Sequence, residues 1–389
     1  MKRVGVIIGG KSVEHEVSII TGLQIFENID RTKYEAMVIY IEKTGKWLVG
    51  EALASIETYK TKNFNNLLEV MPWKSSDDRA VLCLYPNPDI KQGFLSKKRE
   101  KILVDVVIPA THGTSVEDGV LQGVLETCGV PYGFSDVKAS ALGMDKVLMK
   151  KVFKAEQLSV LPYVWFYRSQ YDQLKEQCLL ESEAIGYPLI VKPSNLGSSI
   201  GIGKARNRNE LEYTIEVAFH YDRKIIIEKC LENPREINCS VMGYENDLQA
   251  SLCEEPIGWQ EYLKFEDKYM SKNGNKNDKG TDKRIIPADI PDYISERIQL
   301  LAKEAFKSID AKGVARIDFL LEGEEIYVNE INTIPGSASF YLWEPSGVKF
   351  KDLINRLIEI ALQKHADNSE KINSYDVDLL NNMTKGIKG

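Results

Sequence analysis

The chain opens with a short apolar segment, residues 4–8 (VGVII), that runs directly into Gly9 and Gly10. A strand buried on both faces has such a continuous apolar sequence. A helix is expected next, at residues 17–26. Such a strand–loop–helix unit begins a parallel sheet, because the helix must cross one face of the sheet before the next strand is added. The opening therefore predicts an α/β fold.

Residues 5–12 (GVIIGGKS) also match the phosphate-binding pattern G-x-x-x-x-G-K-[ST]. In a working loop of this kind, the strand precedes the first glycine and the variable residues form the loop. Here the variable residues are Val, Ile, Ile and Gly, which belong to the strand itself. The match is therefore interpreted as coincidental, and a P-loop NTPase is set aside.

Hydrophobic periodicity predicts further strands and helices that alternate along the chain. Strands are expected at residues 37–41, 103–109, 163–167, 187–191, 224–228, 315–321 and 326–330. Helices are expected at residues 140–154, 170–178, 291–307 and about 349–364, with one more around residues 121–125. Residues 50–100 give weaker signals and are predicted to contain irregular insertions and an edge hairpin. Residues 271–283 are strongly polar and are expected to form a mobile loop over a site.

Charge and cysteine usage exclude several classes of protein. Fifty Lys and Arg residues against fifty-seven Asp and Glu give a net charge of −7, which argues against nucleic acid or an anionic membrane as the main partner. The six cysteines are scattered without a C-x-x-C pair, as expected for reduced thiols in a cytoplasmic protein. No apolar run approaches the ~20 residues of a membrane helix.

A Gly/Ser-rich segment from Lys192 to Gly201 (KPSNLGSSIG) lies between two expected strands. Small residues allow backbone N–H groups to surround a phosphate, and Lys192 supplies a positive charge at the base of the loop. The alternative is a plain hairpin turn with a solvated lysine. The length of the loop favours the phosphate-binding interpretation.

Two later strands have polar residues at alternate positions, Arg316 and Asp318 in the first and Glu330 and Asn332 in the second. Residues i and i+2 of a strand share a face, so antiparallel pairing would bring these side chains together. Oxygen donors without His or Cys suit Mg²⁺. The alternative is an edge hairpin whose polar residues face solvent. A metal site beside a phosphate loop predicts nucleotide-dependent phosphoryl chemistry.

With these segments, the sequence resembles the D-alanine–D-alanine ligases of the ATP-grasp superfamily over residues 4 to about 362. The matching segments, in family order, are residues 14–18, 112–119, 144–146, 192–201, 228–229, 267–269, 316–318 and 329–336. The resemblance implies a three-domain α/β ATP-grasp ligase with an N-terminal parallel-sheet (pre-ATP-grasp) domain. Its expected parts are an N-terminal substrate domain at 1–133, a central ATP-grasp domain at 134–226, a C-terminal catalytic domain at 227–365 and a polar tail at 366–389.

The resemblance also implies roles for individual residues in binding ATP and metal. Lys146 and Lys192 would contact the ATP phosphates, Lys268 the γ-phosphate, Glu228 the adenine amino group and Glu236 the ribose. The remaining residues implied for ATP binding are Ser199 and Lys229. Two Mg²⁺ or Mn²⁺ ions would be bound by Asp318, Glu330 and Asn332.

For the amino-acid substrates, Glu16 would bind the ammonium group of the first molecule, and His112 would lie near its carboxylate. Ser198 and Tyr269 would join Glu16 in a hydrogen-bonded set that closes the mobile loop. The oxyanion of the second step would be stabilised by Arg316 and by the backbone N–H of Gly336. Any one of these residues alone has an ordinary surface or packing interpretation, and only the joint pattern favours a role in catalysis.

The activity implied by the resemblance is ATP-dependent formation of D-alanyl-D-alanine for peptidoglycan precursors through an acyl phosphate, with small amino acids as partners and a homodimer as the usual assembly. Two alternatives remain. One is an ATP-grasp ligase that joins D-alanine or another amino acid to a different second substrate. The other is a nucleotide-binding regulator without turnover, which has no chemical need for the complete set of lysine, arginine and carboxylate residues.

The resemblance is incomplete after Pro335 and Gly336. Members of the family typically continue to a Ser-His-Ser run, whose final hydroxyl helps to bind the carboxylate of the second substrate. Here Phe340 replaces the histidine and Tyr341 replaces the final serine. A phenol can still donate a hydrogen bond, but its greater length would shift or shrink the subsite. One interpretation is a rearranged loop that keeps the usual specificity. The other is that the second substrate differs from D-alanine, or that Ser339 binds its carboxylate in place of Tyr341.

Overall fold

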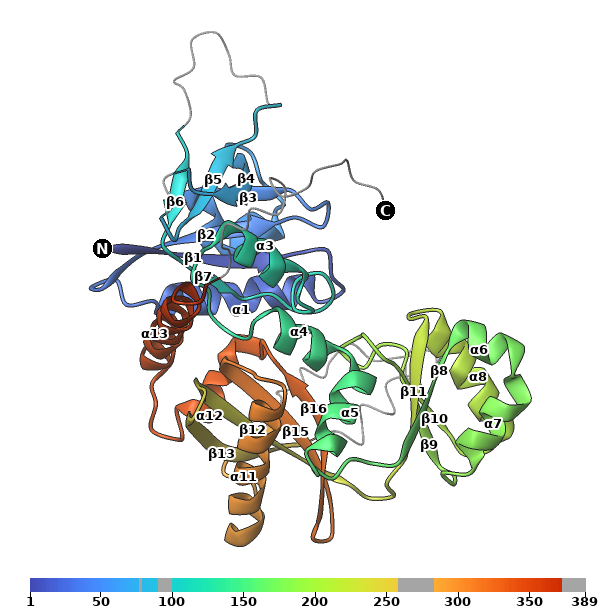
Figure 1. The fold of residues 1–389 in the computed structure, drawn as a ribbon. Coiled ribbons are helices and arrows are strands. Elements are labelled where there is room, and N and C mark those ends of the chain that lie inside the picture. The colour runs from blue at the N-terminus through green and yellow to red at the C-terminus, as the bar shows by residue number, and fades with distance from the viewer. Residues whose placement is uncertain (77–78, 90–99, 258–282, 373–389) are drawn as a thin grey trace, which may run out of the picture.

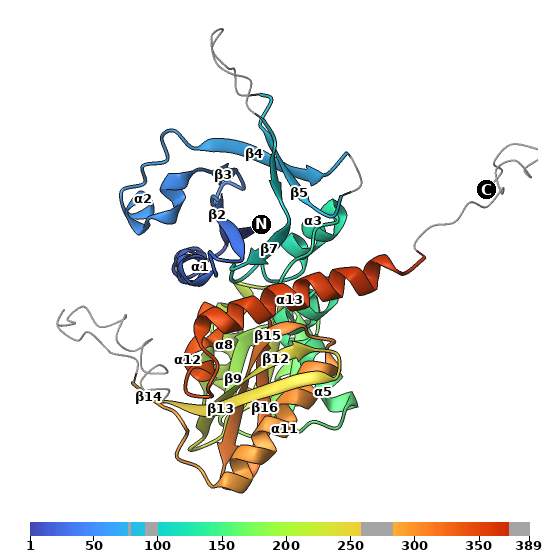
Figure 2. The ribbon, with the colours of Figure 1, turned by 90° about the vertical axis from the view of Figure 1, so that its left-hand side faces the viewer.

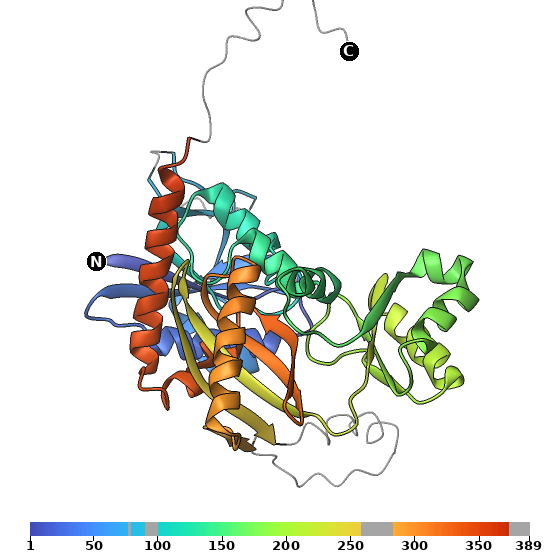
Figure 3. The same ribbon diagram turned by 60° about the horizontal axis from the view of Figure 1, so that its bottom comes forward.

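The computed structural model describes residues 1–76, 79–89, 100–257 and 283–372. These residues form a mixed α/β molecule that contains three sheets (Figure 1). The second sheet and its helices stand to one side of the other two sheets, and this separation is visible in a second orientation (Figure 3). None of the described helices combines the length and the apolar character needed to cross a bilayer.

The first sheet has the strand order β6-β5-β4-β3-β2-β1-β7. Its parallel part consists of β1 (Lys2–Gly9) with β2 (Tyr34–Ile41) on one side and β7 (Val106–Pro109) on the other, and α1 (His15–Asn28) makes the first crossover. β1 extends through Gly9, so the four variable residues of the apparent P-loop, residues 6–9, are indeed strand. The interpretation of that motif as coincidental is confirmed.

The rest of the first sheet is antiparallel. It consists of β3 (Trp47–Val49), β4 (Leu68–Lys74), β5 (Leu82–Pro86) and β6 (Ile102–Val104). Residues 50–100 therefore contribute two regular strands, together with the short helices η1 (Glu51–Ala54) and α2 (Ile56–Lys60). The prediction of irregular insertions underestimated this region, because its strands are only partly buried and their apolar pattern is weak.

Single residues interrupt three elements that the sequence predicted as continuous. Asp105 separates β6 from β7, and its carboxylate accepts a 2.6 Å hydrogen bond from the backbone N–H of Arg3. Asp145 separates α4 (Val137–Met144) from α5 (Lys146–Ala155) and caps α5 by accepting from two backbone N–H groups. Leu174 separates α6 (Arg168–Gln173) from α7 (Lys175–Glu183).

The second sheet is antiparallel, in the order β10-β9-β11-β8. Its strands are β8 (Tyr163–Tyr167), β9 (Leu189–Pro193), β10 (Gly203–Ala205) and β11 (Lys224–Lys229). The helices α6, α7 and α8 (Arg208–Phe219) lie together against this sheet (Figure 1). The Gly/Ser-rich segment joins β9 to β10, as the sequence predicted.

The third sheet is also antiparallel, in the order β14-β13-β12-β15-β16. Its strands are β12 (Arg235–Tyr244), β13 (Asp247–Ile257), β14 (Lys283–Ile285), β15 (Gly313–Glu322) and β16 (Glu325–Asn332). Apolar side chains of this sheet pack against α11 (Asp292–Ser308) in one core cluster. The sequence analysis did not predict β12 or β13, which form the middle of this sheet.

The last long helix, α13 (Phe350–Ser369), lies between the first and third sheets (Figure 2). Its apolar residues share a core cluster with β1 and α1, although the expected domain division assigns this helix to the C-terminal part. α3 (Val120–Cys128) leads into the central region, and η2 (Gly336–Ser339) and α12 (Phe340–Trp343) connect β16 to α13. The division at residues 133, 226 and 365 stays a prediction, and β11 spans its second boundary.

Candidate active site

Lys192 lies near the end of β9, where the Gly/Ser-rich loop begins. Its ammonium group is 2.6 Å from one carboxylate oxygen of Glu228 on the neighbouring strand β11. Lys150, from α5, is 2.7 Å from the other oxygen. The side chains of Lys150 and Glu228 are each 1% exposed. We refer to Lys150, Glu228 and Lys192 as the ion triad.

Burial by itself raises the pKa of a carboxyl group, because the charged form loses its water. At Glu228 the two lysines outweigh burial and lower the pKa to about 2. Burial would lower the pKa of Lys192, but Glu228 and Glu330 outweigh that effect and raise it. Glu228 is therefore ionised at neutral pH. The carboxylate predicted to meet adenine contacts the same lysine that is predicted to meet the phosphates.

The first turn of α5 brings a further lysine to the Gly/Ser-rich loop. Lys146 donates to the carbonyl of Leu196 over 2.8 Å and lies 3.6 Å from Glu330. Lys146 and Lys150 are four residues apart and therefore lie on one face of α5. The helix thus directs two lysines toward the space between the loop and β16.

The strands β15 and β16 pair antiparallel, with Asp318 opposite Glu330 and Arg316 opposite Asn332. Arg316 donates to both carboxylate oxygens of Asp318, over 2.6 and 2.8 Å. Asn332 donates to the same carboxylate over 2.9 Å. The predicted strand pairing is confirmed, whereas the metal-binding roles of these residues stay predictions.

The carboxylates at this end of the sheet repel one another. Burial and the neighbouring charge of Asp318 raise the pKa of Glu236 to about 8. Burial also raises the pKa of Asp318, while nearby lysines outweigh burial at Glu330 and lower its pKa. A divalent cation would relieve this repulsion, and carboxylate and amide oxygens are the ligands that Mg²⁺ prefers. Asp318, Glu330 and Asn332 therefore fit a metal site.

Within the described ranges, no group of three or more His, Cys, Asp or Glu side chains could hold a metal ion by itself. The proposed donor set contains only two such residues, together with an asparagine. Its completion depends on oxygens from outside the protein, such as water and nucleotide phosphate.

Asp318 also belongs to a row of polar residues that crosses the third sheet. The register places Glu330 opposite Asp318, and Asp318 opposite Asn238 of β12. It then places Asn238 opposite Glu254 of β13. Directly opposed residues of antiparallel strands point to the same face. Their apolar neighbours pack against α11, so this polar row faces away from that helix.

On the N-terminal side, the structure places another carboxylate, Glu14, beside Ser198, while the role of Glu16 in binding the first amino acid stays a prediction. Glu16 was expected to bond with Ser198, but Glu16 is exposed on the first turn of α1. Instead, the hydroxyl of Ser198 donates to the carboxylate of Glu14. The reason is that α1 begins at His15, so Glu14 precedes the helix and extends toward the Gly/Ser-rich loop, whereas Glu16 follows the helical rotation toward solvent.

His112 is buried against α1, where its Nε2 lies 2.9 Å from the hydroxyl of Thr21. Burial lowers the pKa of His112 to about 4, so the imidazole is uncharged at neutral pH. The backbone N–H of Ser337 donates to the same Thr21 hydroxyl over 3.2 Å. His112 can therefore offer hydrogen bonding, but no positive charge, to a substrate carboxylate.

Glu117 joins two loops at this side of the site. Its carboxylate accepts hydrogen bonds from the backbone N–H groups of Gly113, over 3.0 Å, and Ile334, over 3.1 Å. Burial raises its pKa to about 8. This bridge fixes the loop after β7 against the loop after β16, which leads to Gly336.

Tyr341 lies in α12, and the guanidinium carbon of Arg284 on β14 is 3.9 Å from the centre of its ring. Burial raises the pKa of Tyr341. Ser339 is fully buried, and its hydroxyl has no hydrogen-bond partner in the part of the chain that the structure describes. Gly336 begins η2, beside these residues. The two residues predicted for the second substrate therefore have different surroundings.

Three further predictions concern residues that were expected to bind ATP or to close over it. Lys229 follows Glu228 on β11 and points to the opposite face, where it donates to the carbonyls of Gly186 and Tyr187. Successive residues of a strand alternate in direction, so its side chain lies on the face opposite that of Glu228, and its role in binding ATP stays a prediction. Ser199 lies half-buried in the Gly/Ser-rich loop. Lys268, Tyr269 and most of the predicted lid at 271–283 lie outside the described residues.

The site also contains residues that the sequence analysis did not single out. Lys150 could have been found, since it follows Lys146 at helical spacing beside an otherwise apolar face. Glu14 stood in the same motif as Glu16. Asn238 and Glu254 had no such signal, because their strands were not predicted.

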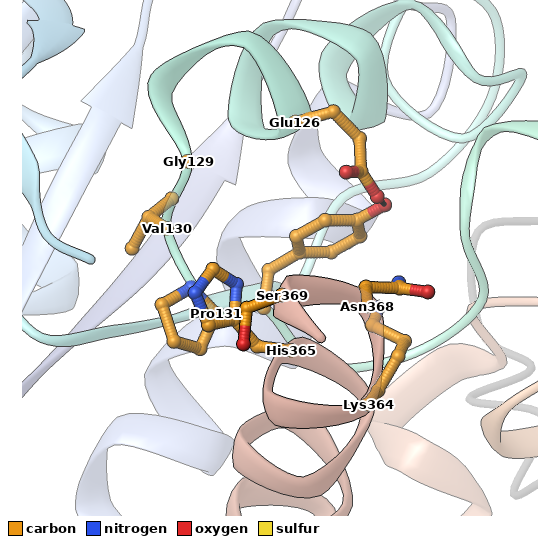
Figure 4. A pocket seen from close by; sticks show the side chains of 9 residues that line it. Glu126, Gly129, Val130, Pro131, Lys364, His365, Asn368 and Ser369 are labelled. Atoms are coloured by element: carbon orange, nitrogen blue, oxygen red, sulfur yellow. Dashed lines mark hydrogen bonds between the residues drawn. The ribbon is translucent and has the colours of Figure 1, made fainter. Parts of the chain in front are cut away.

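A separate pocket of about 170 Å³ lies between α3 and the last turns of α13 (Figure 4). Its lining includes Glu126, Tyr132, Lys364 and His365. The ammonium group of Lys364 lies 3.6 Å from the ring centre of Tyr132, and burial lowers its pKa to about 7. None of the residues predicted for catalysis or binding lines this pocket.

The comparisons with known proteins cover nearly the whole chain. Two family models match, "D-ala D-ala ligase N-terminus" at residues 3–135 and "D-ala D-ala ligase C-terminus" at residues 152–359. The D-alanine–D-alanine ligase of Thermosipho melanesiensis is 38% identical over 381 residues, which is 98% of each chain.

Two solved structures show the same similarity. The D-alanine–D-alanine ligase of Coxiella burnetii superposes with a TM-score of 0.78 at 28% identity, covering 95% of this chain and 96% of the other. The D-Ala:D-Ser ligase of Enterococcus faecalis superposes with a TM-score of 0.76 at 30% identity, covering 92% and 99%. The similarity therefore extends over all three sheets.

Proposed function

Since the chain belongs to the D-alanine–D-alanine ligase family, we propose that it joins two molecules of D-alanine into a dipeptide while ATP is converted to ADP and phosphate. The observation that supports this most directly is a chain of contacts between three parts of the molecule. Lys192 of the ion triad is 3.4 Å from Asn329 of β16, and Lys146 is 3.6 Å from Glu330 of the polar row. Lys146 also donates to Leu196 in the Gly/Ser-rich loop, where Ser198 contacts Glu14.

In the first step, the carboxylate of one D-alanine attacks the γ-phosphoryl group of ATP and forms an acyl phosphate. Lys146 and Lys192 bind the phosphates, and their carboxylate partners in the structure are replaced by phosphate oxygens. Glu228 stays ionised through Lys150 and accepts a hydrogen bond from the adenine amino group. Glu236 binds the ribose. The ammonium group of the first D-alanine binds Glu14, beside Ser198.

In the second step, the amine of the second D-alanine attacks the acyl carbon and phosphate leaves. Arg316 and the backbone N–H of Gly336 stabilise the oxyanion, a contribution of about 3–4 kcal/mol per donor in comparable sites. Neutral His112 and Thr21 hydrogen-bond near the carboxylate of the first D-alanine. Tyr341 lies beside the second D-alanine, at the place where the family usually has a serine.

Asp318, Glu330 and Asn332 would bind two divalent ions, Mg²⁺ or Mn²⁺. Such ions neutralise charge on the transferring phosphoryl group. We further propose that the enzyme acts in the cytoplasm as a homodimer, with the assembly usual in its family, and supplies the dipeptide for peptidoglycan precursors.

Release of ADP with and without D-alanine, followed by mass spectrometry of the product, tests this proposal. ADP release that depends on D-alanine and yields D-alanyl-D-alanine is expected. ATP hydrolysis that does not respond to D-alanine contradicts the proposed activity. A product in which D-alanine is joined to another amino acid or hydroxy acid identifies the alternative with a different second substrate. That alternative is less favoured, because the similar curated relatives are named D-alanine–D-alanine ligases.

A matched pair of variants tests the assignment of the first amino-acid site. Glu14→Gln removes the charge that contacts Ser198 and is expected to raise the KM for the first D-alanine by about 10- to 100-fold, as for the loss of a charged hydrogen bond. Glu16→Gln changes an exposed side chain two residues away and is expected to leave that KM unchanged. The opposite pattern restores Glu16 to the site.

A further inference from the structure

Glu254 lies on β13, at the opposite end of the polar row from Glu330. Its side chain is 4% exposed. Oε1 accepts a hydrogen bond from the amide nitrogen of Asn238 over 3.3 Å. Oε2 has no hydrogen-bond partner among the described residues. A buried carboxylate with an unused oxygen costs free energy unless a donor reaches it.

Asn238 provides a second unused acceptor beside the first. It is 3% exposed, and its amide oxygen also lacks a hydrogen-bond partner within the described parts of the chain. The nitrogen of the same amide contacts Glu254, so the two unused oxygens belong to side chains that contact each other on adjacent strands. Two adjacent acceptors, one of them charged, fit a cationic donor with several hydrogens, which is the chemistry of an ammonium group.

The titratable groups around Glu254 come from three neighbouring elements, β14, β15 and α12. Arg284 of β14 places a guanidinium nitrogen 4.0 Å from Oε2, which is too long for a hydrogen bond, and it lies over Tyr341 of α12. Arg316 and Asp318 of β15 act on Glu254 across Asn238. Burial raises the pKa of Glu254, and the two arginines only partly offset this effect. Glu254 is therefore a stronger base than an exposed glutamate.

The position of Arg316 indicates which reactant reaches Glu254. In the proposed function, Arg316 contacts the carbonyl group of the acyl phosphate. Two of the three proposed metal ligands, Glu330 and Asn332, lie on β16 with Lys146 beside Glu330, while the third, Asp318, lies on the same strand as Arg316. Glu254 lies two strands away on the opposite side. It therefore lies on the side from which the attacking amine can approach without meeting the phosphate.

We propose that Glu254 and Asn238 bind the ammonium group of the acceptor amino acid, and that Glu254 takes one proton from it. This inference rests on the proposed function. The neutral amine attacks the acyl carbon, the C–N bond forms, and the C–O bond to phosphate breaks with its electron pair leaving on phosphate. Of the two remaining protons on nitrogen, one goes to phosphate and one stays on the amide, while Glu254 returns its proton to water.

The test separates the two half-reactions of the full-length enzyme. Hydroxylamine is an uncharged nucleophile at neutral pH, so it converts the acyl phosphate to a hydroxamate without needing a base. Glu254→Gln is expected to form hydroxamate at the wild-type rate at low D-alanine concentration. Its kcat/KM for the acceptor D-alanine is expected to fall about 100-fold, as for the loss of a general base. This loss shrinks as the pH rises, because more of the acceptor is then a neutral amine.

Glu255→Gln is the matched control, because Glu255 faces the other side of β13 and pairs with Arg235 at 2.6 Å. This variant is expected to keep the wild-type ratio of dipeptide to hydroxamate. Glu254→Asp is expected to recover part of the dipeptide rate. Asn238→Ala provides an independent variant, with a raised acceptor KM and unchanged hydroxamate formation. Thermal melting and ATP binding check the fold of each protein.

The outcomes distinguish this inference from the proposed function. Wild-type dipeptide formation by Glu254→Gln overturns the inference. An equal loss of hydroxamate and dipeptide in a folded variant also overturns it, because Glu254 would then act in the first step. If the wild-type enzyme itself forms no hydroxamate, the proposed acyl-phosphate chemistry is wrong instead.

Discussion

Buried carboxylates are paired with cations differently at the two ends of the proposed active site, the nucleotide end around Glu228 and the acceptor end around Glu254. At the nucleotide end, Glu228 is 1% exposed, and a lysine ammonium group lies within 2.7 Å of each carboxylate oxygen. At the acceptor end, Glu254 is almost as deeply buried, yet the guanidinium nitrogen of Arg284 is 4.0 Å from one of its carboxylate oxygens, which is beyond hydrogen-bond length. Both carboxylates stand on antiparallel strands, and both are proposed to act in the same reaction.

The difference teaches how each end responds to its ligand. The ion triad is already compensated, so a nucleotide exchanges one anion for another around lysines that are in place. At the acceptor end, Asn238 and the two arginines compensate the charge of Glu254 only in part, so a bound donor would add to that compensation. A buried carboxylate that lacks a full set of partners costs free energy. A second substrate without an ammonium group to donate to Glu254 is therefore expected to bind more weakly. The following predictions test this contrast, from the largest expected effect to the smallest.

Glu330→Gln should remove activity from both ends at once. A neutral amide cannot replace a carboxylate that binds divalent ions, so hydroxamate and dipeptide formation are both expected to fall by about 1,000-fold, equivalent to ~4 kcal/mol. The control is Glu325→Gln, an exposed position on the same strand, which should have wild-type rates. Unchanged turnover of Glu330→Gln at saturating Mg²⁺ removes Glu330 from the metal site.

Lys150→Met should affect the nucleotide end alone. The variant leaves Glu228 with one lysine, so unfolding free energy should fall by about 3–5 kcal/mol, the usual cost of breaking a buried ion pair. The KM for ATP should rise, while the KM for the acceptor D-alanine should not. Chemical denaturation and initial rates measure these effects. Lys154→Met, at an exposed position one turn later, is the control. An equal rise in both KM values contradicts the separation of the two ends.

Tyr341→Ser should change the acceptor end by a smaller amount. The serine restores the residue usual in the family and removes the ring under Arg284, so the KM for the second D-alanine should shift by about 3- to 10-fold, the effect of one hydrogen bond. Tyr341→Phe keeps the ring and tests the hydroxyl separately. The KM for ATP should stay constant in both. Identical kinetics of all three proteins place Tyr341 outside the acceptor subsite.

Lys364→Met should have the smallest effect on activity, because Lys364 is a buried charge that lies outside both ends. Burial lowers its pKa to about 7 in the folded protein, from 10.5 when exposed. The unfolded chain therefore binds more protons between these values, and wild-type stability rises with pH in that window. The variant should be more stable than wild type near pH 7, and the difference should shrink toward pH 10. A pH-independent difference contradicts the shifted pKa.

The sequence predicted much of the fold where one local rule applied. The apolar segment at β1, the Gly/Ser-rich loop after β9 and the alternate polar residues of β15 and β16 all lie where their patterns indicated. Predictions failed where a single side chain overrode a continuous pattern. Asp105 and Asp145 each interrupt an apolar run by binding backbone N–H groups, and periodicity does not report such hydrogen bonds.

By itself, the sequence determined the fold class, the family and the types of residue at the site, because these depend on local order along the chain. Only the tertiary structure decided that Glu14 rather than Glu16 meets Ser198, since Glu14 precedes α1 whereas Glu16 lies in its first turn and is exposed. It also decided that Glu254 stands in line with Asp318, because strand register brings together residues that are far apart in sequence. Such contacts set how deeply each carboxylate is buried and how close the nearest cation lies. They therefore decide which carboxylates are neutralised within the protein and which can still bind a cationic ligand.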